Sequence, residues 1–239
     1  MGLVVNNLKN NVNILINKDI ELKNLNLKDN LNINLEIEKN SQVNIVDNIL
    51  ELNIFSNNLN IILNENSKIN YILKTDCLHG CAYFCKSCLK NKENIIINKK
   101  LNIKLMGQNS RASIKIAFNG AGKNVLNLET IQEHLAASTK SNLNVKICLS
   151  QFAGLISNNI IKVAKNLKQI ESFQSTKALM FGCSSSAICT PVLEIESQDV
   201  ICKHGAAISK INPEQIFYLE SRGLDYCKAK DLLINAFLE

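Results

Sequence analysis

The feature that most constrains this chain is an alternation of apolar and polar residues, repeated in short runs. Residues 12–16, 31–37 and 59–63 all follow this period of two. Successive side chains of a strand point to opposite faces, so each run predicts a half-buried strand. Short polar segments at 39–42 and 64–68 separate the runs. The pattern predicts a mainly β protein of many short strands joined by small polar corners.

One strand–turn–strand phrase recurs in degenerate form, as I-E-K-N-S-Q-V-N-I at 37–45 and L-N-E-N-S-K-I-N-Y at 63–71. Such a repeat favours a stacked β-solenoid, in which each coil covers the apolar face of the next. A β-sandwich is the alternative, but hairpin signals such as Asn-Gly are missing between these strands. Further strands are expected at 101–105, 112–118, 126–135, 143–149, 155–163 and 193–201.

The period changes near the C-terminus. Asn212 is a good N-cap and Pro213 a good first helical residue, Gly223 can close that helix, and Asp225 can cap a second one. Helices are therefore expected at 213–222 and 225–237. This predicts two parts, a β-solenoid core at 1–210 and a helical segment at 211–239.

The bulk composition narrows the class of protein. Nine cysteines with no signal peptide favour a reducing, intracellular compartment, and an odd count suits free thiols or metal ligands. No apolar run approaches the ~18 residues of a membrane span. The net charge is +6, but the lysines are scattered along the sequence, so a solvated surface is favoured over nucleic-acid binding. We attribute the richness in Asn, Ile, Lys and Leu to an AT-rich genome.

A dense group of thiols lies in the middle of the chain, at Cys77, Cys81, Cys85 and Cys88. The last three have the C-x-x-x-C-x-x-C spacing of radical-SAM enzymes, in which they bind three irons of a [4Fe–4S] cluster. The strand-rich sequence that follows does not suit the alternating strands and helices of such an enzyme. Packing of small apolar side chains is the simplest interpretation. A local zinc or iron–sulfur site made of all four thiolates stays open.

A second candidate site lies at Cys202 and His204, in a short strand-like run that a turn is expected to follow. Side chains at positions i and i+2 of a strand point to the same side, so these two metal-ligating groups could share one iron or one cluster. His134, flanked by Glu133, is more simply interpreted as a histidine packed at a coil corner and bonded to its neighbour than as a ligand or catalytic group.

From about Leu101 onward the chain resembles the SufB/SufD family of iron–sulfur cluster assembly scaffolds. The resemblance rests mainly on the segments 132–136, 190–195, 202–210 and 214–223. It implies a right-handed parallel β-helix with a C-terminal helical segment, acting as a non-enzymatic scaffold. It also implies pairing with a SufB-like paralogue, docking of a SufC-like ABC ATPase on the helices, and a transient nascent cluster at the SufB–SufD interface. ATP would be used only by that partner.

The resemblance is closer to SufD than to SufB. Ser186 stands where SufB carries a cluster-building Cys, with Cys183 and Cys189 nearby but out of register, and Gly205 stands where SufB tends to have Glu. The Cys-x-His-Gly of SufD is present, which assigns Cys202 and His204 to the shared cluster. A homodimer, a plastid or other organellar location in place of the cytoplasm, and the radical-SAM alternative at Cys81, Cys85 and Cys88 stay open. Compared with that family, the sequence is short and lacks most of the usual N-terminal helical region.

Overall fold

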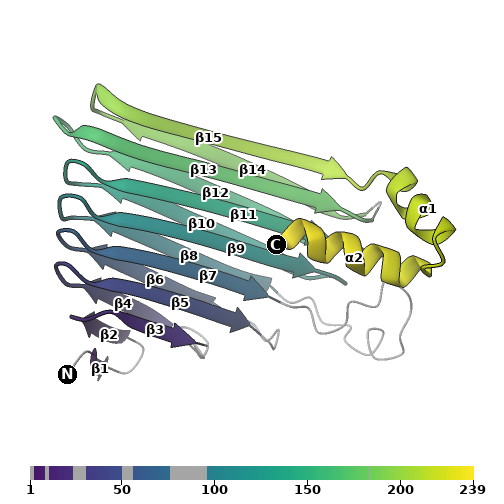
Figure 1. Cartoon of the computed structure of the whole chain (residues 1–239), viewed down its shortest axis with the longest axis horizontal. Helices are drawn as coiled ribbons and strands as arrows, with labels where there is room; N and C mark the ends of the chain where they lie inside the picture. Colours follow the sequence, from purple (N-terminus) through teal and green to yellow (C-terminus); the bar gives the residue numbers. More distant parts are fainter. Residues whose placement is uncertain (1–2, 9–10, 24–30, 50–55, 76–95, 183) are drawn as a thin grey trace.

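The computed structural model describes residues 3–8, 11–23, 31–49, 56–75, 96–182 and 184–239. Over these residues the chain forms two β-sheets that lie face to face, with two helices after the last strand (Figure 1). The chain passes from one sheet to the other with each strand, so that strands of even number build one sheet and strands of odd number from β3 onward the other. Every described pair except β1 and β2 is parallel, which confirms the predicted solenoid over the sandwich.

The eight-stranded sheet contains, in spatial order, β1 (Leu3–Leu8), β2 (Asn11–Ile16), β4 (Leu31–Ile37), β6 (Ser56–Leu63), β8 (Ile96–Leu105), β10 (Val125–His134), β12 (Gly154–Val163) and β14 (Ser186–Ile195). The seven-stranded sheet contains β3 (Ile20–Lys23), β5 (Gln42–Ile49), β7 (Lys68–Thr75), β9 (Arg111–Gly120), β11 (Lys140–Leu149), β13 (Lys168–Met180) and β15 (Asp199–Lys210). One even and one odd strand make a coil.

The space between the sheets is the core, and its chemistry changes along the solenoid. Its two largest fully buried side chains are Tyr71 on β7 and Phe118 on β9, and buried Ile and Leu residues extend from β2 to β13. In the coils of β10–β11 and β12–β13, polar side chains take many of the inward positions. They are Thr130, Gln132, His134, Ser141, Ser157, Asn159, Ser172, Gln174 and Thr176. All of them except Gln132 hydrogen-bond to another residue of these coils, so the coils are held by directional contacts as well as apolar packing.

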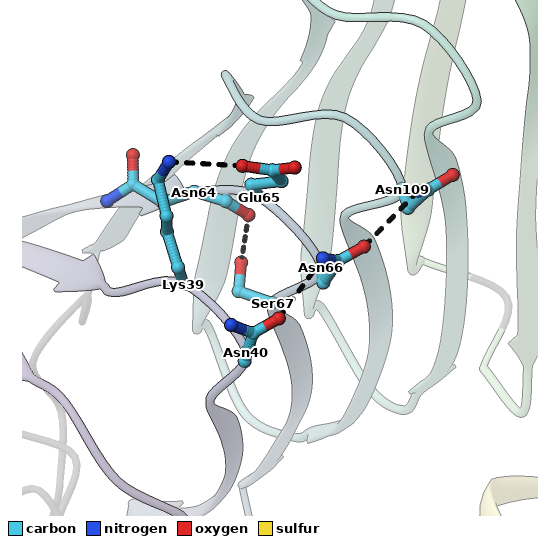
Figure 2. Close-up of polar contacts among 7 residues, drawn as sticks. All are labelled: Lys39, Asn40, Asn64, Glu65, Asn66, Ser67 and Asn109. Atoms are coloured by element: carbon cyan, nitrogen blue, oxygen red, sulfur yellow. Dashed lines mark hydrogen bonds and ion pairs between the residues drawn. The ribbon is translucent and has the colours of Figure 1, made fainter.

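The corners between strands explain the repeated phrase of the sequence. Asn40, Asn66 and Asn109 occupy equivalent corners with φ of 61°, 56° and 61°, the left-handed region that Asn tolerates better than most residues. Their side-chain amides form a ladder, with Nδ2–Oδ1 distances of 3.1 and 3.2 Å (Figure 2). The Ser67 hydroxyl also donates to the Asn64 carbonyl at 2.7 Å.

A second asparagine ladder runs across the outer face of the eight-stranded sheet. Asn13, Asn34, Asn60 and Asn102 hydrogen-bond in series, at 2.8, 2.8 and 2.9 Å. Stacked amides of this kind satisfy each other's donors and acceptors at the spacing of neighbouring strands. The asparagine content that we attributed to genome bias therefore has a structural role in both ladders.

The two helices form as the capping residues predict. In α1 (Pro213–Ser221) the Asn212 side chain accepts from the Glu214 N–H at 3.0 Å, and Gly223 follows the helix with φ of 90°. In α2 (Tyr226–Leu238) the Asp225 carboxylate accepts from the Lys228 N–H at 2.9 Å. Among the described residues, no helix combines the length and apolarity that a membrane span needs.

Helix α2 folds back over the outer face of the seven-stranded sheet and contacts β9 and β11 (Figure 1). Ala229 and Ile234 are its buried apolar residues. The ammonium group of Lys146 on β11 lies 6.0 Å from the Phe237 ring, and that of Lys230 lies 5.3 Å from the Phe181 ring. Apolar burial and these cation–π contacts hold the helix against the sheet.

Two sequence predictions of strand bounds are wrong. The strand expected at 193–201 is divided by a corner, because β14 ends at Ile195 and β15 begins at Asp199. The turn expected soon after His204 is part of a strand, since β15 continues to Lys210 by pairing with β13. Small residues such as Gly205 and Ala206 suggested a turn, but backbone pairing with the preceding coil overrides that local preference.

Candidate functional site at the open end of the solenoid

The last coil, β14 and β15, closes the described part of the solenoid at one end, and its inward face is uncovered. Both strands are edge strands of their sheets. The alternating burial of β12 and β13 is lost in β14 and β15, although their registers continue in step. Leu193, Ile195 and Ile208 stand above buried residues of the previous coil, yet are 36, 37 and 44% exposed. Exposed apolar side chains and free strand edges are features typical of surfaces that contact another protein chain.

Cys202 and His204 lie on this open end and face the same side. In the register of β15 with β13, Cys202 pairs with Ser172 and His204 with Gln174, and both partners are buried inward residues. Cys202 is half-buried and His204 is exposed. The i, i+2 geometry expected from the sequence is confirmed, so the thiol and imidazole can approach one metal ion from the same direction.

Cys189 is a third soft ligand on the same side, which sequence reasoning set aside. It pairs with the buried Ser157, so it too is directed inward from β14 and is half-buried. Cys189 is an even number of residues away from Leu193 and Ile195, so the alternation of the strand could have predicted that all three side chains lie on the same face. Among the described residues no three Cys, His, Asp or Glu side chains lie close enough together to hold a metal ion. Cys202 and His204 are two side chains of metal-ligating type on one side of a strand.

A buried chain of hydrogen bonds runs beneath Cys202. Ser172, its neighbour in the sheet, lies 2.7 Å from Ser141 between hydroxyl oxygens, and the Ser141 oxygen lies 2.9 Å from His134 Nε2. His134 Nδ1 lies 2.7 Å from the Thr139 oxygen, whose hydroxyl donates to the Ala136 carbonyl at 3.1 Å. Because Thr139 uses its own hydrogen there, it accepts from Nδ1–H. Nε2 then accepts from Ser141, which accepts from Ser172.

Burial is the main cause of the pKa shifts of Cys202, Cys189 and His134. Burial raises the pKa of the Cys202 thiol, and a hydrogen bond from the Ser172 backbone opposes this effect. Burial also raises the pKa of Cys189. Burial lowers the pKa of His134 to about 4, so it is a neutral, hydrogen-bonded residue of the core at neutral pH. Its partners are Thr139 and Ser141, not Glu133, which pairs with Lys104 at 3.6 Å on the outer surface.

The helical segment presents a separate surface. A groove of about 580 Å³ runs between α1 and α2, lined by Tyr218, Leu219, Leu232 and Leu233 among others. Phe217, Tyr218 and Leu232 are 72, 57 and 50% exposed. Large exposed aromatic and aliphatic side chains on adjacent helices are typical of a docking surface for another protein. The thiol group at Cys77, Cys81, Cys85 and Cys88 lies outside the described residues.

The geometry defines a β-solenoid whose uncovered last coil bears a Cys-x-His pair and whose last helix folds back on its outer face. The family model described as "SUF system FeS cluster assembly, SufBD core domain" matches residues 27–237. The chain therefore belongs to the SufB/SufD family of the SUF iron–sulfur cluster assembly system.

Several of its relatives among curated proteins carry the SufD name. The "Iron-sulfur cluster assembly protein SufD" of Escherichia coli (strain K12) is 30% identical over 142 residues, 59% of this chain and 34% of the relative. The SufD of Plasmodium falciparum (isolate 3D7) is 24% identical over 221 residues, 85% and 15% of the two chains. That of Bacillus subtilis (strain 168) is 26% identical over 134 residues, 56% and 31%.

These comparisons confirm the SufD-like resemblance and give no support to the radical-SAM alternative. The chain spans about a third or less of the length of these relatives.

Proposed function

We propose that this chain is a non-enzymatic scaffold subunit of an iron–sulfur cluster assembly complex, located in the cytoplasm or in an organelle such as a plastid. A nascent cluster is its cargo, held transiently where the open end meets a second SufB/SufD-type chain. The observation that carries the proposal is the uncovered last coil, where Cys202 and His204 lie on the inward side of β15 together with exposed apolar residues. A SufB-like paralogue is the favoured partner and a second copy of this chain the alternative.

The ligand chemistry supports a site shared between chains. Cys202 offers a thiolate after loss of its proton, and His204 offers an imidazole nitrogen that is more labile on iron, which suits a cluster that must be handed on. Beneath His204, the buried side-chain oxygen of Gln174 has no hydrogen-bond partner among the described residues. An acceptor in that place suits the second N–H of a metal-bound imidazole. The remaining ligands would come from the partner.

Replacing Cys202 or His204 with Ala is expected to remove most of the iron and sulfide that co-purifies with the assembled complex. Each change deletes one proposed ligand. Loss of even a residue that only hydrogen-bonds to a metal ligand weakens metal binding by about 10- to 100-fold. Iron and acid-labile sulfide per complex, with the visible absorption of the cluster, provide the measurement.

Cys148 offers a matched control, because it is buried beneath α2, far from the ligand pair in sheet register, and burial raises the pKa of its thiol to about 12. Cys148→Ser should leave the cluster content unchanged. Unaltered iron in both the Cys202 and the His204 variant would show that neither is a ligand.

The groove between α1 and α2 is proposed to dock an ABC-type ATPase, through which alone the complex would use ATP. Tyr218→Ala or Leu232→Ala is expected to weaken that association by about tenfold, because truncating an exposed anchor at the centre of an interface typically costs 1–2 kcal/mol or more. Co-purification of a SufC-like ATPase with the full chain measures this. Asn235→Ala, an exposed polar residue of α2 outside the groove-lining set, is the control. Equal capture by all variants would place the docking surface elsewhere.

A further inference from the structure

We propose that the outer face of the seven-stranded sheet carries a binding site for a pyrophosphate group, which goes beyond the proposed scaffold function. A cavity of about 360 Å³ lies over the first residues of β5, β7, β9, β11 and β13. It is on the face that α2 covers further along β9 and β11. Three cations, Lys68, Arg111 and Lys140, form one wall.

The three cations are direct neighbours in the sheet. Lys68 pairs with Arg111, and Arg111 with Lys140, in consecutive parallel strands about 4.8 Å apart. Like charges directly opposite each other destabilise a sheet. Lys140 is neutralised by Glu171 at 2.6 Å, but Lys68 and Arg111 form no ion pair with any described residue. Glu171 is the one carboxylate among the described residues that line the cavity, so three cations against one carboxylate leave a net charge of +2.

The other face of the solenoid shows how a register partner can neutralise an outward lysine in this fold. On the eight-stranded sheet Lys100 pairs with Glu129 at 2.7 Å, and Lys162 with Glu194 at 2.8 Å. In each case the carboxylate is the register partner on the neighbouring strand. Lys68 and Arg111 have no such carboxylate among the described residues, and an anionic ligand would supply the missing charge.

The positive charge is confined to a short row. Gln42 on β5 precedes Lys68 in the row, and Glu171 on β13 follows Lys140. A neutral residue thus stands at one end and a carboxylate at the other. A long polyanion would meet no further cation along this row, whereas a diphosphate is matched by two adjacent free cations. Arg offers a planar fork to one phosphoryl group and Lys a point charge to the next.

A second row of outward residues supplies neutral hydrogen-bond donors and an aromatic ring. Asn70, Ser113 and Asn142 are register neighbours two residues further along the same strands. Phe173 continues this row on β13 and is 37% exposed. The shared chemistry is the pyrophosphate group, and its source is either inorganic pyrophosphate or a nucleoside diphosphate whose base stacks on Phe173.

Isothermal titration of the full chain with inorganic pyrophosphate, and separately with ADP, tests the site at physiological salt. Saturable binding of one ligand per chain is expected. Lys68→Gln and Arg111→Gln should each weaken it about tenfold, the usual effect of losing a hydrogen bond to a charged group. Lys177→Gln, an exposed lysine of the same sheet that does not line the cavity, should change it less than twofold. If the natural ligand is a nucleotide, Phe173→Ala should weaken the binding of ADP but not that of pyrophosphate. If the natural ligand is inorganic pyrophosphate, Phe173→Ala should weaken the binding of neither.

Three outcomes overturn the proposal. They are no saturable binding of pyrophosphate or ADP at millimolar concentration, an equal loss in the Lys177 and Arg111 variants, and displacement of pyrophosphate by a tighter-binding single-stranded oligonucleotide. Thermal unfolding confirms that each variant is folded. The result is separable from the scaffold function, because substitutions at Lys68 and Arg111 leave Cys202 and His204 untouched and should leave the iron content of the complex unchanged.

Discussion

Replacing Gly107 with Ala is expected to lower the melting temperature of the chain by about 10 °C. A Cβ atom at this corner would lie 2.0 Å from the backbone nitrogen of Glu65 and 2.2 Å from the carbonyl carbon of Asn64. Both are main-chain atoms of the preceding coil, so no rotamer change can relieve the clash. The corner must shift, which endangers the hydrogen bond from the Gly107 N–H to the Leu63 carbonyl at 2.9 Å. We expect a loss of roughly 3–5 kcal/mol in the free energy of unfolding.

Gly205 provides the matched control for this substitution. It lies within β15 at the uncovered coil, and a Cβ atom there would meet nothing within 4 Å. Gly205→Ala should therefore leave stability unchanged or raise it by up to about 1 kcal/mol, because Ala loses less backbone entropy than Gly on folding. Thermal and urea unfolding of the two variants measure the contrast. Equal melting temperatures would show that the backbone of the preceding coil at Asn64 and Glu65 can move to accept a Cβ atom at residue 107.

Acidification from pH 6.5 to pH 4 is expected to remove roughly 3 kcal/mol of stability through His134 alone. Burial lowers the pKa of this residue from 6.5 to about 4 in the folded chain. Between these values the unfolded state binds a proton that the folded state does not, so the free energy of unfolding falls as the pH falls. Above pH 6.5 the residue is neutral in both states and contributes no pH dependence. The magnitude follows from about 1.4 kcal/mol per pH unit.

The His134→Gln variant separates this effect from other titrating groups. Gln keeps a neutral polar side chain beside Thr139 and Ser141 but cannot take up a proton. Its overall stability should be lower, yet its free energy of unfolding should fall less steeply between pH 6.5 and pH 4 than that of the unsubstituted chain. Urea titrations across this range provide the two slopes. Parallel slopes would mean that His134 is accessible to protons in the folded state.

Local patterns predicted the strands and helices well, because alternation and capping act over a few residues. The runs at 31–37 and 59–63 became β4 and part of β6, and Asn212 and Asp225 cap the two helices as expected. The strand bounds near residue 195 were wrong because a solenoid corner needs no Gly or Pro signal. At Asn40 and Asn66 the left-handed backbone is instead carried by asparagines whose amides bond between coils.

The shared side of Cys202 and His204 was predictable from their i, i+2 spacing, whereas their surroundings were not. The inward direction of Cys189 and the hydrogen-bond chain from Ser172 to His134 depend on register between strands some thirty residues apart in sequence. Lys68 and Arg111 likewise looked like two of many scattered lysines and arginines. Stacking of coils placed them side by side and left them without carboxylates among the described residues.

The sequence by itself determined the fold class, the capped helices and the side on which Cys202 and His204 lie, since each of these follows from a period of two or 3.6 residues. The tertiary structure alone decided which coil is left uncovered, what lies beneath the ligand pair and where positive charge collects. Those properties arise from parallel register, which brings every strand beside another about one coil away in the chain. No local period encodes that distance, so contacts between coils become visible only when the coils are stacked.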